Sequence, residues 1–378
     1  MSEQAKTAAY KRMILMNPGP VVTDDRVRNV LALPDMCHRE PEFSALMTRV
    51  RHKLTLVSGG DSDYSTVVFT GSGTAALEAT LSSIVPANGK MVILDNGHYG
   101  ERLAKICSVH RIPMTVLTAG WGQPLDLKLL ERVLHEEPTA SHVAMIHHET
   151  STGILNPVHE VGQIVARAGR SLVVDAISSL GGEILDVRND RIDWCVGTAN
   201  KCIESVPGLS FVIAPKKRLD ALSQNQPRTF YLDLYSQYVA EEKSQAPAFT
   251  PAIPTFLALE VALDLLQEEG VRERQERYKS LADLLRCGLR ELGLRLLLPD
   301  ALQSSTLTAI YFPEGRTYSF LHDRLKELGF VIYAGQDNLK QKVFRLANMG
   351  QISKQDIQNF LGALAQVLRE QSVQRQCQ

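Results

Sequence analysis

No stretch of this 378-residue sequence is apolar over the length needed to cross a bilayer, and the first twelve residues, MSEQAKTAAYKR, hold no apolar segment of signal-peptide length. We therefore expect neither a membrane anchor nor an export signal. Cysteines are few and scattered. They form no CxxC pair and no Cys/His spacing typical of metal ligands, and stand at positions 37, 107, 195, 202, 287 and 377. This scatter argues against a metal site and a disulfide framework, and favours the reducing cytoplasm.

An excess of charge of either sign is also missing. The chain has 41 Lys and Arg against 42 Asp and Glu, a formal net charge of −1, so it offers no electrostatic attraction for nucleic acid or a membrane surface. Internal repeats and low-complexity tracts are absent from the sequence as well. We therefore expect the partner to be a small molecule.

The sequence does contain a regular alternation of short apolar runs with polar segments of helix length. The runs lie at residues 66–70, 91–94, 114–117, 142–146, 172–174, 194–196 and 210–214. This alternation predicts an α/β fold with a mostly parallel sheet covered by helices.

A chain of this length favours a large domain with a smaller second one. The proline-rich stretch at 246–254 indicates a stiff connector between them. We predict an N-terminal arm (1–15), a large domain (16–254) and a small α+β domain (255–378). In the small domain, residues 255–293 are predicted to be helical and 330–333 to form a strand.

Two side chains of complementary chemistry follow two of the apolar runs: Asp175 ends one, and Lys201 lies just beyond another. In an open α/β sheet the carboxyl ends of neighbouring strands face one crevice, so the acid and the amine should converge. Pyridoxal phosphate needs that pair, because a lysine holds its aldehyde as a Schiff base and an acid keeps its ring nitrogen protonated. On these two residues alone, a helix-capping aspartate and an exposed loop lysine explain the pattern better.

A glycine-flanked turn, Gly71-Ser72-Gly73, precedes a predicted helix over 74–84. Such a turn points backbone N–H groups and the positive end of the helix dipole at a ligand, and the hydroxyls of Ser72 and Thr74 add donors. Together they would cradle a phosphate. Similar turns join strands to helices where nothing is bound, so this motif alone leaves both interpretations open.

Polar and aromatic side chains also follow the other runs. Tyr99 or His98 offers a flat face for a planar ring, and Thr150 can donate to a phenolic oxygen. Each has an ordinary structural explanation, as a partly buried aromatic residue or a turn residue. Their gathering at successive strand ends favours one shared site.

Six segments together carry a resemblance to a known family: NPGP (17–20), TGSGTAALEA (70–79), DNGHYG (95–100), HHETSTGILNP (147–157), VDAISSLGG (174–182) and TANKCIESVPGLSFV (198–212). From about residue 14 to about residue 368 the chain resembles the class V aminotransferases. The ANKCI-x-x-VPG pattern around Lys201 and the Asp-Leu-Tyr at 233–235 are most similar to members that move an amino group from 2-aminoethylphosphonate to pyruvate. The serine–pyruvate and alanine–glyoxylate transaminases match less well there.

The resemblance implies the aspartate aminotransferase fold (fold type I), with a seven-stranded sheet in the large domain, and pyridoxal 5′-phosphate as cofactor. It implies that Lys201 binds the cofactor and moves the transferred proton, and that Asp175 pairs with the ring nitrogen. It also implies a homodimer with shared active sites, in which Thr250 reaches the cofactor phosphate of the neighbouring subunit. The remaining implied cofactor contacts come from Ser72, Gly73, Thr74, Tyr99, Thr150, Ile177 and Asn200.

Arg345 lies within the apolar run VFRLANMG, where a lone guanidinium is costly without an anionic partner. A buried structural ion pair would satisfy it. The resemblance instead implies that Arg345 holds the substrate carboxylate, and it is also the first candidate for binding the phosphonate of the donor. The candidates for further substrate contacts are Pro18, Gly19, His38 and Arg39.

Three hypotheses follow. The leading one is transfer of the amino group of 2-aminoethylphosphonate to pyruvate. The nearest alternative keeps the cofactor but uses another donor, such as serine, alanine or a related aminophosphonate, or ends in elimination as a lyase. The third, from a different class, is a non-catalytic α/β protein that binds a phosphorylated ligand at the turn 71–73.

Overall fold

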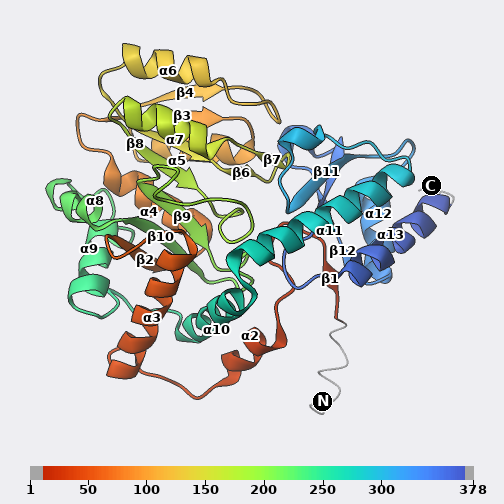
Figure 1. Cartoon of the computed structure of the whole chain (residues 1–378), viewed down its shortest axis with the longest axis horizontal. Coiled ribbons are helices and arrows are strands. Elements are labelled where there is room, and N and C mark those ends of the chain that lie inside the picture. The colour runs from red at the N-terminus through yellow and green to blue at the C-terminus, as the bar shows by residue number, and fades with distance from the viewer. Residues whose placement is uncertain (1–11, 371–378) are drawn as a thin grey trace, which may run out of the picture.

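A seven-stranded sheet forms the centre of the molecule, in the strand order β2-β10-β9-β8-β5-β3-β4 (Figure 1). The computed structural model describes residues 12–370, so most of the predicted N-terminal arm lies outside the described residues. Only β10 runs antiparallel to its neighbours, which confirms the predicted mostly parallel sheet. Its strands are β2 (Tyr64–Thr70), β3 (Lys90–Asp95), β4 (Met114–Thr118), β5 (Ala140–Ile146), β8 (Ser171–Asp175), β9 (Trp194–Thr198) and β10 (Leu209–Pro215).

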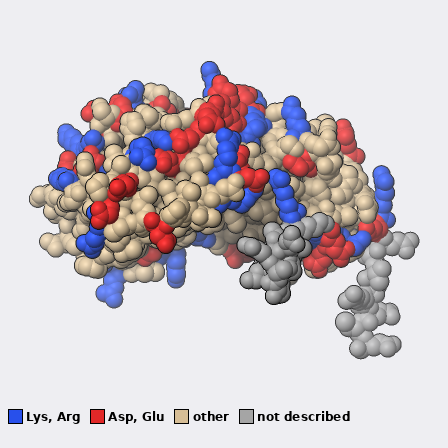
Figure 2. Space-filling model, turned by 90° about the horizontal axis from the view of Figure 1, so that it is seen from below, with Lys and Arg blue, Asp and Glu red and all other residues tan. Residues whose placement is uncertain are grey.

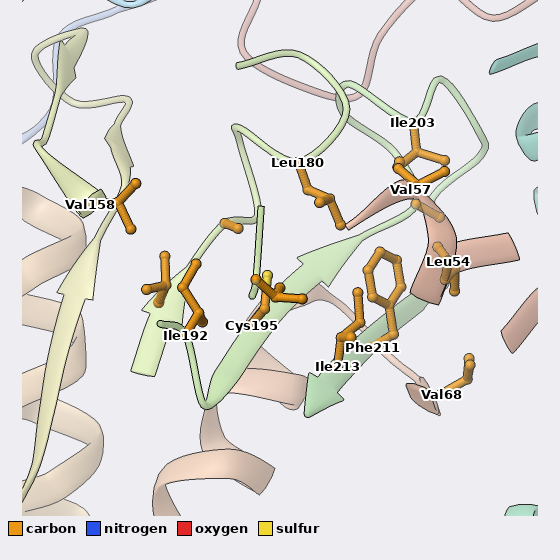
Figure 3. Close-up of a cluster of buried hydrophobic side chains, with 14 of the residues drawn as sticks. Leu54, Val57, Val68, Val158, Leu180, Ile192, Cys195, Ile203, Phe211 and Ile213 are labelled. Atoms are coloured by element: carbon orange, nitrogen blue, oxygen red, sulfur yellow. The ribbon is translucent and has the colours of Figure 1, made fainter. Parts of the chain in front are cut away.

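Helices cover both faces of this sheet because side chains along each strand point alternately to either side. In β2, Val68 joins one hydrophobic core while Val67 and Phe69 join the other. Figure 3 shows the first core, where Phe211 packs beside Leu54. That core is covered by α3 (Pro41–Val57), α6 (Leu127–Glu136), α7 (Val158–Arg167) and α10 (Ile253–Glu269), and the second by α4 (Gly73–Ile84), α5 (His98–Val109), α8 (Lys216–Ala221) and α9 (Leu234–Tyr238).

The second domain packs beside the sheet and has its own hydrophobic core (Figure 1). Its antiparallel sheet has the order β11-β14-β13, and the short strand β1 near the N-terminus pairs in parallel with β12. The first described strand therefore belongs to the second domain, and the chain then passes into the large domain. The elements are β1 (Ile14–Leu15), α11 (Val271–Glu291), β11 (Leu307–Tyr311), α12 (Tyr318–Glu327), β12 (Phe330–Val331), β13 (Tyr333–Ala334), β14 (Val343–Ala347) and α13 (Lys354–Arg369).

Two predicted elements of this domain are wrong in detail. The helix predicted over 255–293 is two helices, α10 and α11, because Gly270 between them has a φ of +92°, which helical backbone cannot adopt. The strand predicted over 330–333 is split at Ile332 into β12 and β13, which belong to different sheets. In addition, α10 packs into the core of the large sheet, although the predicted boundary at residue 255 would assign it to the small domain.

The described part of the chain shows a surface of mixed charge and cysteines that form no disulfide. Acidic and basic side chains lie intermingled on the face in Figure 2. Among residues 12–370, no helix combines the length and apolar character needed to cross a membrane, and no His, Cys, Asp and Glu side chains cluster as a metal site. The five cysteines described there are free thiols.

Candidate active site

A cavity of about 170 Å³ opens at the carboxyl ends of β5, β8 and β9, whose last residues line it. This is the edge of an α/β sheet at which ligands bind. The predicted acid and amine both face it, so the structure brings Asp175 and Lys201 together. The lining residues are Ser72, Gly73, Thr74, Leu77, Tyr99, Arg102, Ile146, His148, Asp175, Ile177, Ser178, Thr198, Asn200 and Lys201.

Burial shifts the acid and the amine toward their neutral forms. Asp175 is 5% exposed, and burial raises the pKa of its carboxyl to about 7 although the N–H of Ile177 donates to Oδ1 at 2.9 Å. Burial likewise lowers the pKa of Lys201. The N–H of Glu204 donates to the Lys201 carbonyl at 2.8 Å, which closes the turn that carries the lysine.

The buried acid makes the stability of the ligand-free protein depend on pH. Asp175 keeps its proton up to about pH 7 when folded but loses it near 3.8 when unfolded, so its contribution to stability falls as the pH rises from about 4 to 7. Asp175→Asn mimics the protonated acid and removes this slope. We expect the variant to melt a few degrees above the ligand-free wild type at pH 8, with a smaller difference at pH 5. Equal differences at both pH values would contradict the shift.

The N-terminus of α4 provides a site for an anion. Ser72 is the N-cap residue and its hydroxyl makes no capping hydrogen bond, so the first N–H groups of the helix remain available. A Cβ on Gly73 would lie 2.5 Å from Cδ1 of Ile177, so a larger residue there would push the Ile177 side chain aside. The Thr74 hydroxyl accepts from Arg102 Nη1 at 3.2 Å, which adds a cation to this end of the cavity.

Tyr99 is held at the start of α5 by a buried carboxylate. Oε2 of Glu149 accepts from the N–H groups of Tyr99 and Gly100, at 2.9 and 3.2 Å. Burial acts to raise the pKa of the Tyr99 phenol, but the positive charge of Lys201 helps to lower it overall. The Arg102 guanidinium lies 4.6 Å from the centroid of the Tyr99 ring, so the ring is fixed between α5 and the cavity.

Two buried polar atoms have no hydrogen bond of normal geometry among the described residues: Nε2 of His148, which lines the cavity, and Oγ1 of Thr150, which lies near the Tyr99 phenol. His148 begins β6 (His148–Glu149), which pairs with β7 (Ile154–Leu155). Its Nδ1 lies 3.2 Å from the Ser178 carbonyl, and burial lowers its pKa to about 3, so the ring stays neutral. Unpaired buried polar atoms cost free energy, which a ligand with matching groups would recover.

Arg345 lies on β14, the central strand of the small sheet, and is buried. Nε donates to the Ala334 carbonyl at 2.9 Å, and Nη1 donates to the Thr150 carbonyl at 2.9 Å and to Oε1 of Gln336 at 3.1 Å. In the described part of the chain it forms no ion pair, so the structural ion pair considered from the sequence is absent there. Burial lowers the pKa of Arg345, and an anionic ligand would offset that cost.

The structure places the other predicted residues in two groups. Gly19 lies against the lysine, because a Cβ on it would be 3.2 Å from Cε of Lys201, and Pro18 beside it is buried. Within one chain, seven predicted residues do not line the cavity. Gly19, Pro18, Thr150 and Arg345 lie next to residues that line it or to one another. Thr250 is exposed, and His38 and Arg39 lie in the segment before α3.

Sequence reasoning assigned no site role to Arg102 or to His148. Arg102 lies three residues after Tyr99 on one helix, so both point to the same side, and this spacing could have revealed it. His148 begins the short strand β6, and Thr150 lies in the turn that follows it. Thr198 and Ser178 had no separate signal.

The comparisons with known proteins agree with this geometry. The profile of the family described as aminotransferase class-V matches residues 26–362. The fold and the cavity, with a lysine and an acid at the strand ends, thus define the class: the chain belongs to the class V aminotransferases. It is 37% identical over 356 residues to the 2-aminoethylphosphonate–pyruvate transaminase of Vibrio cholerae serotype O1, covering 93% of this chain and 96% of that protein.

Solved structures support the predicted fold type. An alanine–glyoxylate aminotransferase from Nostoc sp. superposes with a TM-score of 0.90 at 26% identity, covering 95% of this chain and 96% of that one. An aspartate aminotransferase from Thermus thermophilus superposes with a TM-score of 0.85 at 26% identity, covering 94% and 98%. The predicted aspartate aminotransferase fold is confirmed.

Proposed function

We propose that this chain is a transaminase that uses pyridoxal 5′-phosphate to move the amino group of 2-aminoethylphosphonate to pyruvate, giving phosphonoacetaldehyde and L-alanine. The single observation that carries the chemistry is that Lys201 and Asp175 line one cavity beside the N-terminus of α4. The amino donor is proposed from the likeness to the Vibrio cholerae relative.

The residues of the cavity fit the groups of this cofactor. Its phosphate matches the N–H groups at the start of α4, and its aldehyde matches the amine of Lys201. Its ring nitrogen matches the carboxyl of Asp175, and its phenolic oxygen matches the hydroxyl of Thr150, which makes no hydrogen bond of normal geometry among the described residues. When bound, it supplies an aldehyde carbon for the amine and a ring that accepts an electron pair.

Each side chain then has a defined task. Because burial lowers its pKa, Lys201 can stand as a neutral amine that would take a proton from the substrate carbon bearing nitrogen and deliver it to the former aldehyde carbon of the cofactor. Asp175, once opposite a protonated ring nitrogen, becomes a carboxylate, since an opposite charge at close range outweighs burial. Tyr99 lies where its ring can cover one face of the cofactor, and Ile177 packs under Gly73.

Arg345 is proposed to bind the acid groups of both substrates in turn. Its guanidinium is buried and free of carboxylates in the described part of the chain, so a carboxylate or a phosphonate can pair with it without displacing an acid. A planar fork of N–H groups suits either acid. The substrate's nitrogen would then lie toward Lys201.

The test is to incubate the purified protein with pyridoxal phosphate, pyruvate and 2-aminoethylphosphonate, and to measure L-alanine and phosphonoacetaldehyde in equal amounts. No alanine would reject the proposed donor. The superposition on the Nostoc alanine–glyoxylate aminotransferase favours a second candidate, alanine or serine as donor with glyoxylate or pyruvate as acceptor. These pairs belong in the same assay, and release of ammonia without alanine would indicate a lyase.

We also propose a homodimer with shared active sites. Phe230 is 84% exposed, and its ring and that of Tyr231 contact Phe249, beside the exposed Thr250. An exposed aromatic cluster of this kind is typical of an interface. A second subunit covering it would bring Thr250 toward the other cofactor site.

We expect Phe230→Asp to shift the protein from dimer to monomer in size-exclusion chromatography with light scattering, because a charge would be buried in the interface. Activity should fall with the dimer fraction. Val109→Asp is the matched control, since Val109 is 63% exposed at the end of α5, and should change neither. A monomeric wild type with full activity would reject the shared site.

A further inference from the structure

A short segment of the small domain, Gly335–Lys340, crosses from β13 toward β14 and approaches the cavity; we call it the strap. Its turn is tight. The N–H of Leu339 donates to the Gln336 carbonyl at 2.8 Å, and a Cβ on Gly335 would lie 2.3 Å from the Leu339 carbonyl oxygen. Gly335 is therefore required for the strap to turn. Of the two residues after it, Gln336 contacts Arg345 of the small sheet and Asp337 contacts His98 of the large domain.

The strap contacts the large domain at His98, the first residue of α5. Oδ2 of Asp337 lies 2.5 Å from Nδ1 of His98, and Nε2 of His98 lies 3.2 Å from Nη2 of Arg102. An arginine can only donate, so Nε2 must be the acceptor and the ring proton must be on Nδ1, donated to Asp337. Since Arg102 also contacts the Thr74 hydroxyl, the contacts run from the phosphate end of the cavity to the strap.

The neighbouring strap residue, Gln336, contacts Arg345 directly. Of the five N–H groups of Arg345, one on Nε and two on Nη1 are used, the last by Oε1 of Gln336. Within residues 12–370, Nη2 of Arg345 and Nε2 of Gln336 make no hydrogen bond that meets normal geometry. The Tyr99 phenol lies close to the guanidinium and acts against the burial that lowers the pKa of Arg345. An acid that binds Nη1 and Nη2 side by side competes for Nη1 with the Thr150 carbonyl and the Gln336 oxygen, and of these two acceptors only the Gln336 side chain can rotate away.

We propose that Gln336 is a specificity-determining residue for the acid group of the substrate, held in place by the His98–Asp337 contact, an inference that rests on the proposed function. When an acid arrives, the amide turns over and presents Nε2 as a donor next to Arg345. A carboxylate has two oxygens, which the guanidinium satisfies. A phosphonate has a third, and this oxygen accepts from Gln336. The strap thus favours phosphonates over carboxylates of the same length.

The test uses ethylphosphonate and propionate, which lack the amine and differ only in the acid group. Dissociation constants are measured by calorimetry on the cofactor-loaded protein. We expect Gln336→Ala to weaken ethylphosphonate about tenfold and propionate less than threefold, because a hydrogen bond to a charged group is lost only from the former. Asn338→Ala, an exposed strap residue, should change neither.

A second variant, Asp337→Ala, leaves the acid site intact but releases the strap from His98. It should weaken ethylphosphonate more than propionate, by a smaller factor than Gln336→Ala. Equal effects of Gln336→Ala on both acids, or none, would overturn the inference. The proposed function is tested by a different measurement, the formation of alanine from 2-aminoethylphosphonate by the wild type. If no alanine forms, the proposed function fails, and the two dissociation constants still test the role of Gln336.

Discussion

Replacing Lys201 with alanine should lower kcat for transamination at least about a thousandfold. The variant loses both the amine that binds the cofactor aldehyde and the base that moves the substrate proton, and loss of the base alone reaches about 10²- to 10⁴-fold. No other lysine lines the cavity in the described part of the chain. The same change should remove the visible absorption band of the lysine-bound cofactor.

The loss must come from chemistry and not from unfolding. Because burial lowers the pKa of Lys201, burying its charge costs stability, and alanine should leave the melting temperature of the ligand-free protein unchanged or slightly higher. Lys217→Ala, at an exposed lysine in α8, is the matched control and should retain full activity. Substantial turnover by Lys201→Ala would reject the proposed mechanism.

Arg345→Lys should reduce kcat/KM for pyruvate by roughly a hundredfold, mainly through a higher KM. A lysine keeps the charge but cannot present two parallel N–H groups to a carboxylate, and it leaves the Thr150 and Ala334 carbonyls without their donors. Losses of about 1.5–3 kcal/mol for hydrogen bonds to a charged group give this magnitude. Steady-state kinetics with pyruvate and the amino donor varied in turn would measure it.

The control for Arg345→Lys is Arg295→Lys. Arg295 belongs to the same domain but is exposed and stacks on the Tyr311 ring, with its guanidinium 3.9 Å from the ring centroid. Its replacement should leave both KM values within twofold. If Arg345→Lys lowered kcat at an unchanged KM, the guanidinium would not be the binding site of the acid.

Local patterns predicted most of the large domain well. Every apolar run assigned to the central sheet is a strand of it, because β-branched runs bounded by turns specify a strand by themselves. The break at Gly270 was missed because apolar residues at helical spacing continue on both sides of it, and a single glycine can stand inside a helix. The split at Ile332 depends on two partner strands far away in the sequence.

For the candidate site, the sequence by itself determined which chemical groups stand at the strand ends. Asp175 ends β8 and Lys201 lies just beyond the end of β9, and parallel strands bring such ends to one edge. Only the tertiary structure decided what surrounds them. His98 and Asp337 are 239 residues apart, and Arg345 and Thr150 are 195 apart. Such contacts form only when the small domain packs against the large one. The periodicity of apolar residues reports on one helix or strand at a time, so it cannot predict which residues of two separately folded cores will meet.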